Sequence, residues 1–109
     1  LAWILKEEYP NFRDLKIHES SPSKRGLSAM LKAQCPHYLE TQFFPEEPRG
    51  GIVHGFRNEN LEEQTFADES FDIVITQDVM EHVYNPAKAF SEICRTLKRG
   101  GGLIFSRFP

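Results

Sequence analysis

Apolar side chains recur along the chain with two different periods, and each period predicts one kind of element. Helical spacing of leucine, isoleucine and methionine predicts a short helix within residues 1–8 and a second helix that covers residues 27–31 and stops at Cys35-Pro36. Runs of β-branched and aromatic residues predict strands at residues 15–19, 38–44, 51–56, 71–76 and 103–106. Strand and helix therefore alternate along most of the chain.

The strand expected at residues 71–76 has the strongest pattern. Its apolar run is nearly continuous, which is typical of a strand buried on both faces in a parallel sheet. Alternating strands and helices form right-handed crossovers, and these place helices on the faces of such a sheet. The sequence thus predicts an α/β fold of one domain.

A third helix is expected after Asn85, which can cap its first turn, and Pro86 is favoured at that position. The buried stripe of this helix is expected to contain Phe90, Ile93, Cys94 and Leu97. The basic residues 98–99 then lie near the negative end of the helix dipole. Residues 100–102, all glycine, can provide a left-handed cap.

Composition restricts the class of protein further. The formal net charge of -3 argues against a nucleic-acid partner, because such binders commonly carry a basic excess. No apolar run approaches the roughly 20 residues of a membrane span, and no signal peptide is evident. Cys35 and Cys94 show no metal-ligand spacing and fit a reducing compartment, so a cytoplasmic location is expected. The chain opens on Leu1 and stops just after an apolar run, as expected for a piece of a longer protein.

In open α/β sheets, ligands bind beyond the carboxyl ends of the strands, which here means residues 19–25, 42–43, 57–61 and 76–82. Residues 66–83 read FADESFDIVITQDVMEHV, and residues 85–86 and 97–101 follow as NP and LKRGG. Together these segments resemble the fourth strand and the following helix of class I S-adenosylmethionine-dependent methyltransferases, of the methyltransferase type 11 kind.

This resemblance implies a three-layer Rossmann-like fold with a mainly parallel sheet. The chain is then a single partial domain, residues 1–109, that lacks the C-terminal strands of the family. In the family's order of crossovers, residues 15–19 lie between residues 38–43 and 71–76. The strand at residues 103–106 becomes an exposed edge, through which we expect self-association.

The resemblance also assigns a cofactor site for S-adenosylmethionine to the strand ends. Glu19 falls on the family's acidic position, and Ser21 stands where the family has the first glycine of its cofactor loop. Gln42 takes the place of the acidic residue that binds the ribose hydroxyls, and Asn60 that of the aspartate at the adenine amino group. Amides keep hydrogen bonding at both places but lose its charge-assisted part. The expected site also includes Ser20, Phe43, Leu61 and Gln77.

Several of these residues have structural interpretations as well. Glu19 can be a solvated turn residue, residues 20–23 can cap the second helix, and Phe43 can belong to the core. The catalytic residues stay unassigned, with Asp78 and His82 as candidates. Asp78 can instead cap a turn, and His82 can be a general base or simply pack inside the fold. No metal site is expected, because the motif around His82 lacks a second histidine at helical spacing.

Methyl transfer to an unidentified acceptor, which we expect to be a small molecule, competes with two other functions. A degenerate domain of the same fold could act as a binding or interaction module, since Ser21, Gln42 and Asn60 depart from the family's pattern. A nicotinamide-dependent oxidoreductase would need a GxGxxG turn, which Ser21, Ser23 and Gly26 do not supply. An enzyme is expected even without a catalytic triad, because displacement at a sulfonium needs mainly the alignment of donor and acceptor.

Overall fold

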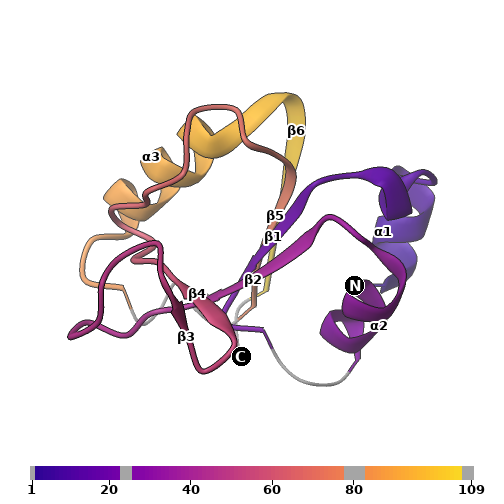
Figure 1. The fold of residues 1–109 in the computed structure, drawn as a ribbon. Coiled ribbons are helices and arrows are strands. Elements are labelled where there is room, and N and C mark those ends of the chain that lie inside the picture. The colour runs from indigo at the N-terminus through magenta and orange to yellow at the C-terminus, as the bar shows by residue number, and fades with distance from the viewer. Residues whose placement is uncertain (1, 23–25, 78–82, 107–109) are drawn as a thin grey trace.

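A computed structural model of the protein describes residues 2–22, 26–77 and 83–106 (Figure 1). In chain order the elements are α1 (Ala2–Glu8), the 3-10 helix η1 (Phe12–Asp14), β1 (Ile17–Ser20), α2 (Leu27–Gln34), β2 (Tyr38–Gln42), β3 (Ile52–Val53), β4 (Phe56–Asn58), β5 (Phe71–Gln77), α3 (Pro86–Thr96) and β6 (Leu97–Ser106). None of the helices in these ranges has both the length and the apolar character needed to cross a bilayer.

The strands form one sheet in the order β3-β4-β2-β1-β5-β6. β1 lies in its centre and pairs in parallel with β2 on one side and β5 on the other, as predicted. β6 pairs in parallel with β5 and is an edge strand. Among the described strands, only β3 runs antiparallel to its neighbour. The mainly parallel α/β sheet expected from the sequence is therefore confirmed.

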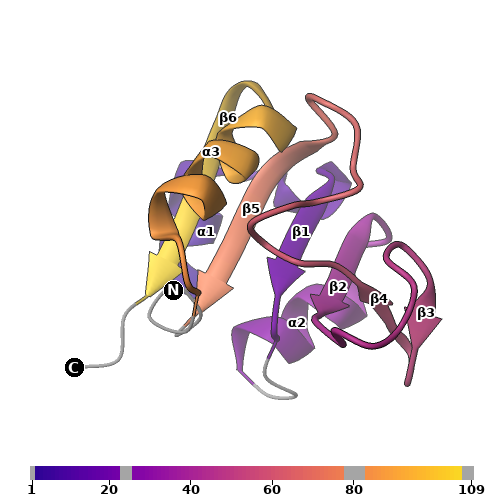
Figure 2. The ribbon, with the colours of Figure 1, turned by 90° about the vertical axis from the view of Figure 1, so that its left-hand side faces the viewer.

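Helices cover both faces of the sheet and complete three layers (Figures 1 and 2). On one face, side chains of α1, η1 and α2 pack against β1 and β5 around Ile17, Ile73 and Ile75. On the other face, α3 and the segment before β5 pack around Val74 and Ile93. Burying such an aliphatic side chain contributes about 1.5–3 kcal/mol, so the two clusters hold the layers together.

The third strand of the parallel sheet differs from the prediction. Residues 51–56 do not form a single strand, because a two-residue turn at His54 and Gly55 reverses the chain between β3 and β4. Both turn residues have positive φ, at 51° and 85°, as a tight hairpin requires. β4 then pairs in parallel with β2, and Asn58 lies opposite Gln42. The turn was missed because histidine is an unusual residue at such a position.

The start of α3 matches the prediction, since the Asn85 side chain accepts a hydrogen bond from the Lys88 amide and proline occupies the first turn. Its buried stripe matches only in part. Ile93 is buried and Leu97 packs against the same cluster, as expected. Cys94 is exposed and Phe90 is 36% exposed, whereas Ala89 and Thr96 are buried in their place. The stripe is thus rotated around the helix towards Ala89 and Thr96.

The predicted glycine cap of α3 is wrong. α3 ends at Thr96, and residues 97–102 form the irregular first part of β6, in which the register with β5 shifts. Gly100 takes its positive φ of 84° inside that stretch and does not cap the helix. The N-cap of α2 is Gly26, which has no side chain, so neither Ser20 nor Ser21 is the N-cap residue of this helix, and Ser23 lies outside the described residues.

Candidate functional site

A pocket of about 470 Å³ lies at the carboxyl ends of the parallel strands. β1, β5 and β6 end at this same edge of the sheet (Figure 2). The pocket collects side chains from the ends of β1, β2 and β4 and from the segment before α3, namely Ser20, Ser21, Phe43, Glu59, Asn60, Leu61, Glu62, Val83 and Tyr84. The parallel topology explains this grouping, because the carboxyl ends of parallel strands all lie at one edge of the sheet.

Ser21 has a backbone conformation that glycine adopts far more readily than serine. Its φ is 51°, in the left-handed region that residues with a Cβ rarely adopt. The Ser21 amide donates a hydrogen bond of 2.8 Å to the carbonyl of Thr41. The turn after β1 therefore keeps its glycine-like shape although no glycine is present, and neighbouring strands hold it there.

The loop after β4 contributes Asn60, Leu61 and Glu62 to the pocket. The Asn60 side-chain oxygen accepts the Glu62 amide at 3.0 Å, which folds the loop back on itself. Leu61 is buried and packs into the core below α3. The Glu62 carboxylate accepts the Tyr84 amide at 3.0 Å, so this loop and the segment before α3 are joined at the pocket.

A cluster of charged and polar side chains connects the two ends of the same loop. Arg57 donates from Nε to Glu59 Oε2 at 2.8 Å and from Nη2 to Thr65 Oγ1 at 3.0 Å. The second oxygen of Glu59 accepts the Thr65 amide at 2.8 Å. The Arg57 guanidinium also lies over the ring of Phe66, 4.3 Å from its centroid. We call Arg57, Glu59 and Thr65 the loop clamp, because they close the base of residues 59–65.

Phe43 is not a core residue, contrary to one interpretation of the sequence. It is 42% exposed and lines the pocket. The Arg49 guanidinium lies over its ring, 4.9 Å from the centroid. An aromatic ring that stays accessible at a pocket can stack against a flat ligand.

Among the described side chains assigned from the sequence, Gln42 does not line the pocket. Gln42 is half-buried, and its carbonyl accepts the Glu59 amide at 3.0 Å. Gln77 is the last residue of β5 and pairs with Ser106, but its side chain falls outside the described structure. Asp78 and His82 lie wholly outside the described residues.

Glu19 is fully buried and lies on the side of the sheet that α2 covers, so it is not a solvated turn residue. Its Oε1 accepts the Ser28 hydroxyl at 2.9 Å and the Tyr38 hydroxyl at 2.6 Å. Burial and the hydrogen bond to Glu19 raise the pKa of Tyr38, so the phenol stays protonated and donates to the carboxylate. Glu19 therefore connects three elements directly beneath Ser20 and Ser21.

His18 is fully buried on the opposite side of β1, where its Nε2 and Thr41 Oγ1 are 2.8 Å apart. Its ring lies 5.1 Å from those of Phe66 and Phe71. Burial, assisted by the positive charge of Arg57, lowers the pKa of His18 to about 3. A neutral imidazole without access to the pocket is structural.

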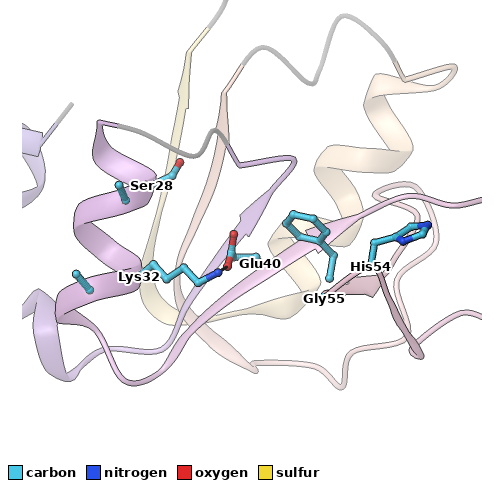
Figure 3. Close-up of a pocket in the computed structure, with 8 residues that line it drawn as sticks. Ser28, Lys32, Glu40, His54 and Gly55 are labelled. Carbon is cyan, nitrogen blue, oxygen red and sulfur yellow. Dashed lines mark ion pairs between the residues drawn. The ribbon is translucent and has the colours of Figure 1, made fainter.

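A second pocket, of about 490 Å³, lies between α2 and the β3–β4 hairpin (Figure 3). Lys32 and Glu40 form an ion pair of 2.9 Å across it, and Ser28 and His54 lie at its sides. It contains none of the side chains assigned to the cofactor from the sequence. The strand-end pocket is therefore the candidate site.

Glu59, Glu62, Val83 and Tyr84 line this site but were not assigned to it individually, although Glu59 lies within the predicted strand-end range 57–61. A signal existed for Glu59, because Arg57 and Glu59 are two residues apart, the spacing that places side chains on one side of an extended chain. No comparable pattern marked Glu62, Val83 or Tyr84. Their position depends on how two distant loops meet.

Comparison with known proteins agrees with this geometry. The sequence profile of a family described as methyltransferase domain matches residues 29–105. Arsenite methyltransferase of Mus musculus is 37% identical over 77 residues, which are 71% of this chain and 20% of that protein. A ubiquinone biosynthesis O-methyltransferase of Parvibaculum lavamentivorans is 30% identical over 86 residues, 79% of this chain and 34% of that protein.

Among solved structures, an S-adenosylmethionine-dependent methyltransferase from Mesorhizobium loti superposes with a TM-score of 0.69 at 17% identity. The superposition covers 94% of this chain and 50% of the other. The chain thus spans about half the length of that structure and a smaller share of the curated relatives. Because the family profile covers most of its residues and the fold agrees, the chain belongs to the methyltransferase domain family.

Proposed function

We propose that this chain is the cofactor-binding part of an enzyme that transfers a methyl group from S-adenosylmethionine to a small-molecule acceptor. Family membership implies this cofactor. The observation that carries the proposal is the strand-end pocket, which gathers five side chains assigned to the cofactor from the sequence: Ser20, Ser21, Phe43, Asn60 and Leu61.

The chemistry of the pocket suits this cofactor. Phe43 offers an accessible ring for the adenine, and Asn60 offers an amide for its polar edge. Among the described lining residues there are two carboxylates, Glu59 and Glu62, and no lysine or arginine. Glu59 is paired with Arg57, which leaves Glu62 as the negative charge of the lining. That charge favours a ligand that carries a positively charged sulfonium.

When bound, S-adenosylmethionine supplies a methyl group activated by that sulfonium. The residues of the chain orient the reactants and exclude water, which is where most of the rate enhancement of a direct displacement arises. Ser21 shapes the turn after β1, and Leu61 seals the pocket towards the core. A base is needed only for an acceptor that loses a proton, and Asp78 and His82 remain our candidates for that base.

Isothermal titration calorimetry of S-adenosylhomocysteine with the full-length protein tests the proposal. We expect saturable binding at one site. Asn60→Ala should weaken it roughly 5- to 20-fold, the equivalent of one or two hydrogen bonds. Asn11→Ala is the matched control, since Asn11 is exposed and its side chain makes no cap hydrogen bond. A full-length protein that does not bind the ligand would instead support the interaction-module alternative.

We also propose the domain organisation, the location and the self-association of the protein. Residues 1–109 form a single partial domain of a larger enzyme in the cytoplasm, where the free thiols of Cys35 and Cys94 stay reduced. The acidic net charge of -3 favours a small acceptor over a polyanion. Edge strand β6 provides a surface for self-association.

A further inference from the structure

The backbone conformation of Ser21 must be stabilised by contacts elsewhere in the structure. Its φ of 51° is unfavourable for serine, and a residue keeps such a conformation only where its surroundings enforce it. Ser21 lines the cofactor pocket, so any relaxation of its backbone changes the shape of the pocket. A glycine at this position would need no such enforcement.

Glu19 makes buried hydrogen bonds to two elements beside this turn, α2 and β2. Glu19 lies in β1 two residues before Ser21, and its carboxylate is fully buried. Tyr38, at the start of β2, donates to Oε1 at 2.6 Å, and Ser28, in the first turn of α2, donates to the same atom at 2.9 Å. The carboxylate therefore connects the strand before the turn to the helix after it.

We propose that Tyr38 and Ser28 are positioning residues for the cofactor: through Glu19 they hold both ends of the segment from β1 to α2 and so keep Ser21 in its left-handed conformation. The proposal rests on the proposed function for the identity of the ligand. Glycine would adopt this conformation without support, whereas serine in this chain depends on the hydroxyls of Tyr38 and Ser28 to keep it. Hydrogen bonds to a buried carboxylate are strong and directional enough for this role.

Affinity for S-adenosylhomocysteine, measured by calorimetry on the full-length protein, is the first test. Tyr38→Phe and Ser28→Ala each remove one donor without changing the shape of the side chain much. We expect each to weaken binding about tenfold, the equivalent of one hydrogen bond to a charged group. The matched controls Tyr9→Phe and Ser70→Ala, outside this network, should leave the affinity unchanged.

A double substitution separates positioning from general stability. In Ser21→Gly the left-handed conformation carries no penalty, so adding Tyr38→Phe should reduce affinity less than about threefold, against tenfold in the parent. A merely stabilising role of Tyr38 would give the same tenfold loss in both backgrounds. Additive losses would therefore overturn the inference, and rescue by glycine would establish it.

Amide hydrogen exchange gives a readout that needs no ligand. The Ser21 amide donates a hydrogen bond to the carbonyl of Thr41, so its exchange rate reports how often the turn opens. Tyr38→Phe should accelerate exchange at Ser21 without affecting Val74 in the core, and Ser21→Gly should remove the difference. Unchanged exchange at Ser21 would contradict the positioning role even in a protein that binds no cofactor, whereas the proposed function fails only when the parent protein does not bind.

Discussion

At the scale of single residues, His18 shows how the fold controls the charge of a side chain. The imidazole packs against the rings of Phe66 and Phe71, and the nearby Arg57 adds to the free-energy cost of protonating it. Its Nδ1 has no hydrogen-bond partner among the described residues. The folded state binds a proton at His18 more weakly than the unfolded state does. The free energy of unfolding therefore depends on pH.

The pKa of His18 is lowered from 6.5 to about 3 in the folded protein. As pH falls from about 6.5 towards 3, the unfolded state binds a proton at His18 that the folded state does not bind. We expect the free energy of unfolding to decrease by on the order of 1 kcal/mol per pH unit in that window, and to be unaffected by this residue above it. Urea denaturation at pH 7 and pH 5 measures the slope.

His18→Gln should flatten this dependence, because glutamine can still bond to Thr41 but does not titrate. The exposed His37→Gln is the matched control and should leave the slope as it is. An equal slope in the His18 variant and the parent protein would show that other groups cause the acid sensitivity.

Residue positions at the site were predictable to the extent that they follow from strand ends. Ser20, Ser21, Phe43, Asn60 and Leu61 are found together because the carboxyl ends of β1, β2 and β4 meet at one edge. The contacts of Glu19 were not predictable. Its partners come from a helix and a strand whose approach depends on packing, which spacing along the chain does not encode.

At the scale of elements, the loop clamp makes residues 59–65 one unit. Glu59→Ala would remove both acceptors that hold Thr65 and leave the half-buried Arg57 without its carboxylate. We expect the free energy of unfolding to fall by about 1–3 kcal/mol, the usual cost of an unpaired polar group in a partly buried place. Chemical denaturation measures it, with the exposed Glu63→Ala of the same loop as the control.

The clamp also predicts an effect on the ligand. Since residues 60–62 line the pocket, Glu59→Ala should weaken S-adenosylhomocysteine binding as well as stability, whereas Glu63→Ala should change neither. Loss of stability with unchanged affinity would show that the loop keeps its shape without the clamp.

A second contact between elements explains a glycine in β6. A Cβ atom at Gly102 would collide with the hydroxyl of Tyr9, which follows α1. Gly102→Ala should therefore destabilise the protein by about 1–3 kcal/mol, as overpacking does. Adding Tyr9→Phe should recover part of that loss, because the hydroxyl is the nearest obstacle. Thermal denaturation of the two single variants and the double variant tests the coupling, and strictly additive effects would contradict it.

At the scale of the whole molecule, the order of the central strands was the most predictable property. The apolar run of β5 requires burial on both faces, and the sheet order places β5 next to the central strand, between β1 and β6. The irregular entry into β6 was less predictable, because it results from a register shift against β5 after Phe71. Local glycine content suggested a helix cap there, but α3 ends at Thr96 and the chain is already extended at Leu97.

The two edge strands of the sheet differ in length. At one edge, β3 has only two residues, whereas β6 at the other edge has ten. A long edge with unpaired backbone groups and partly buried apolar residues such as Leu103 and Ile104 is a template for another strand. We expect the 109-residue chain to self-associate through β6 as its concentration rises.

Sedimentation velocity over a wide range of concentration measures this association. Ile104→Lys should weaken it, since a charge on an edge strand opposes strand addition while the long side chain can reach water from a half-buried position. Ile52→Lys, on the short edge strand β3 where the side chain is 70% exposed, is the matched control and should leave association unchanged. Circular dichroism confirms that both variants keep the fold. A strict monomer at high concentration, or equal association of both variants, would show that β6 is not the contact surface.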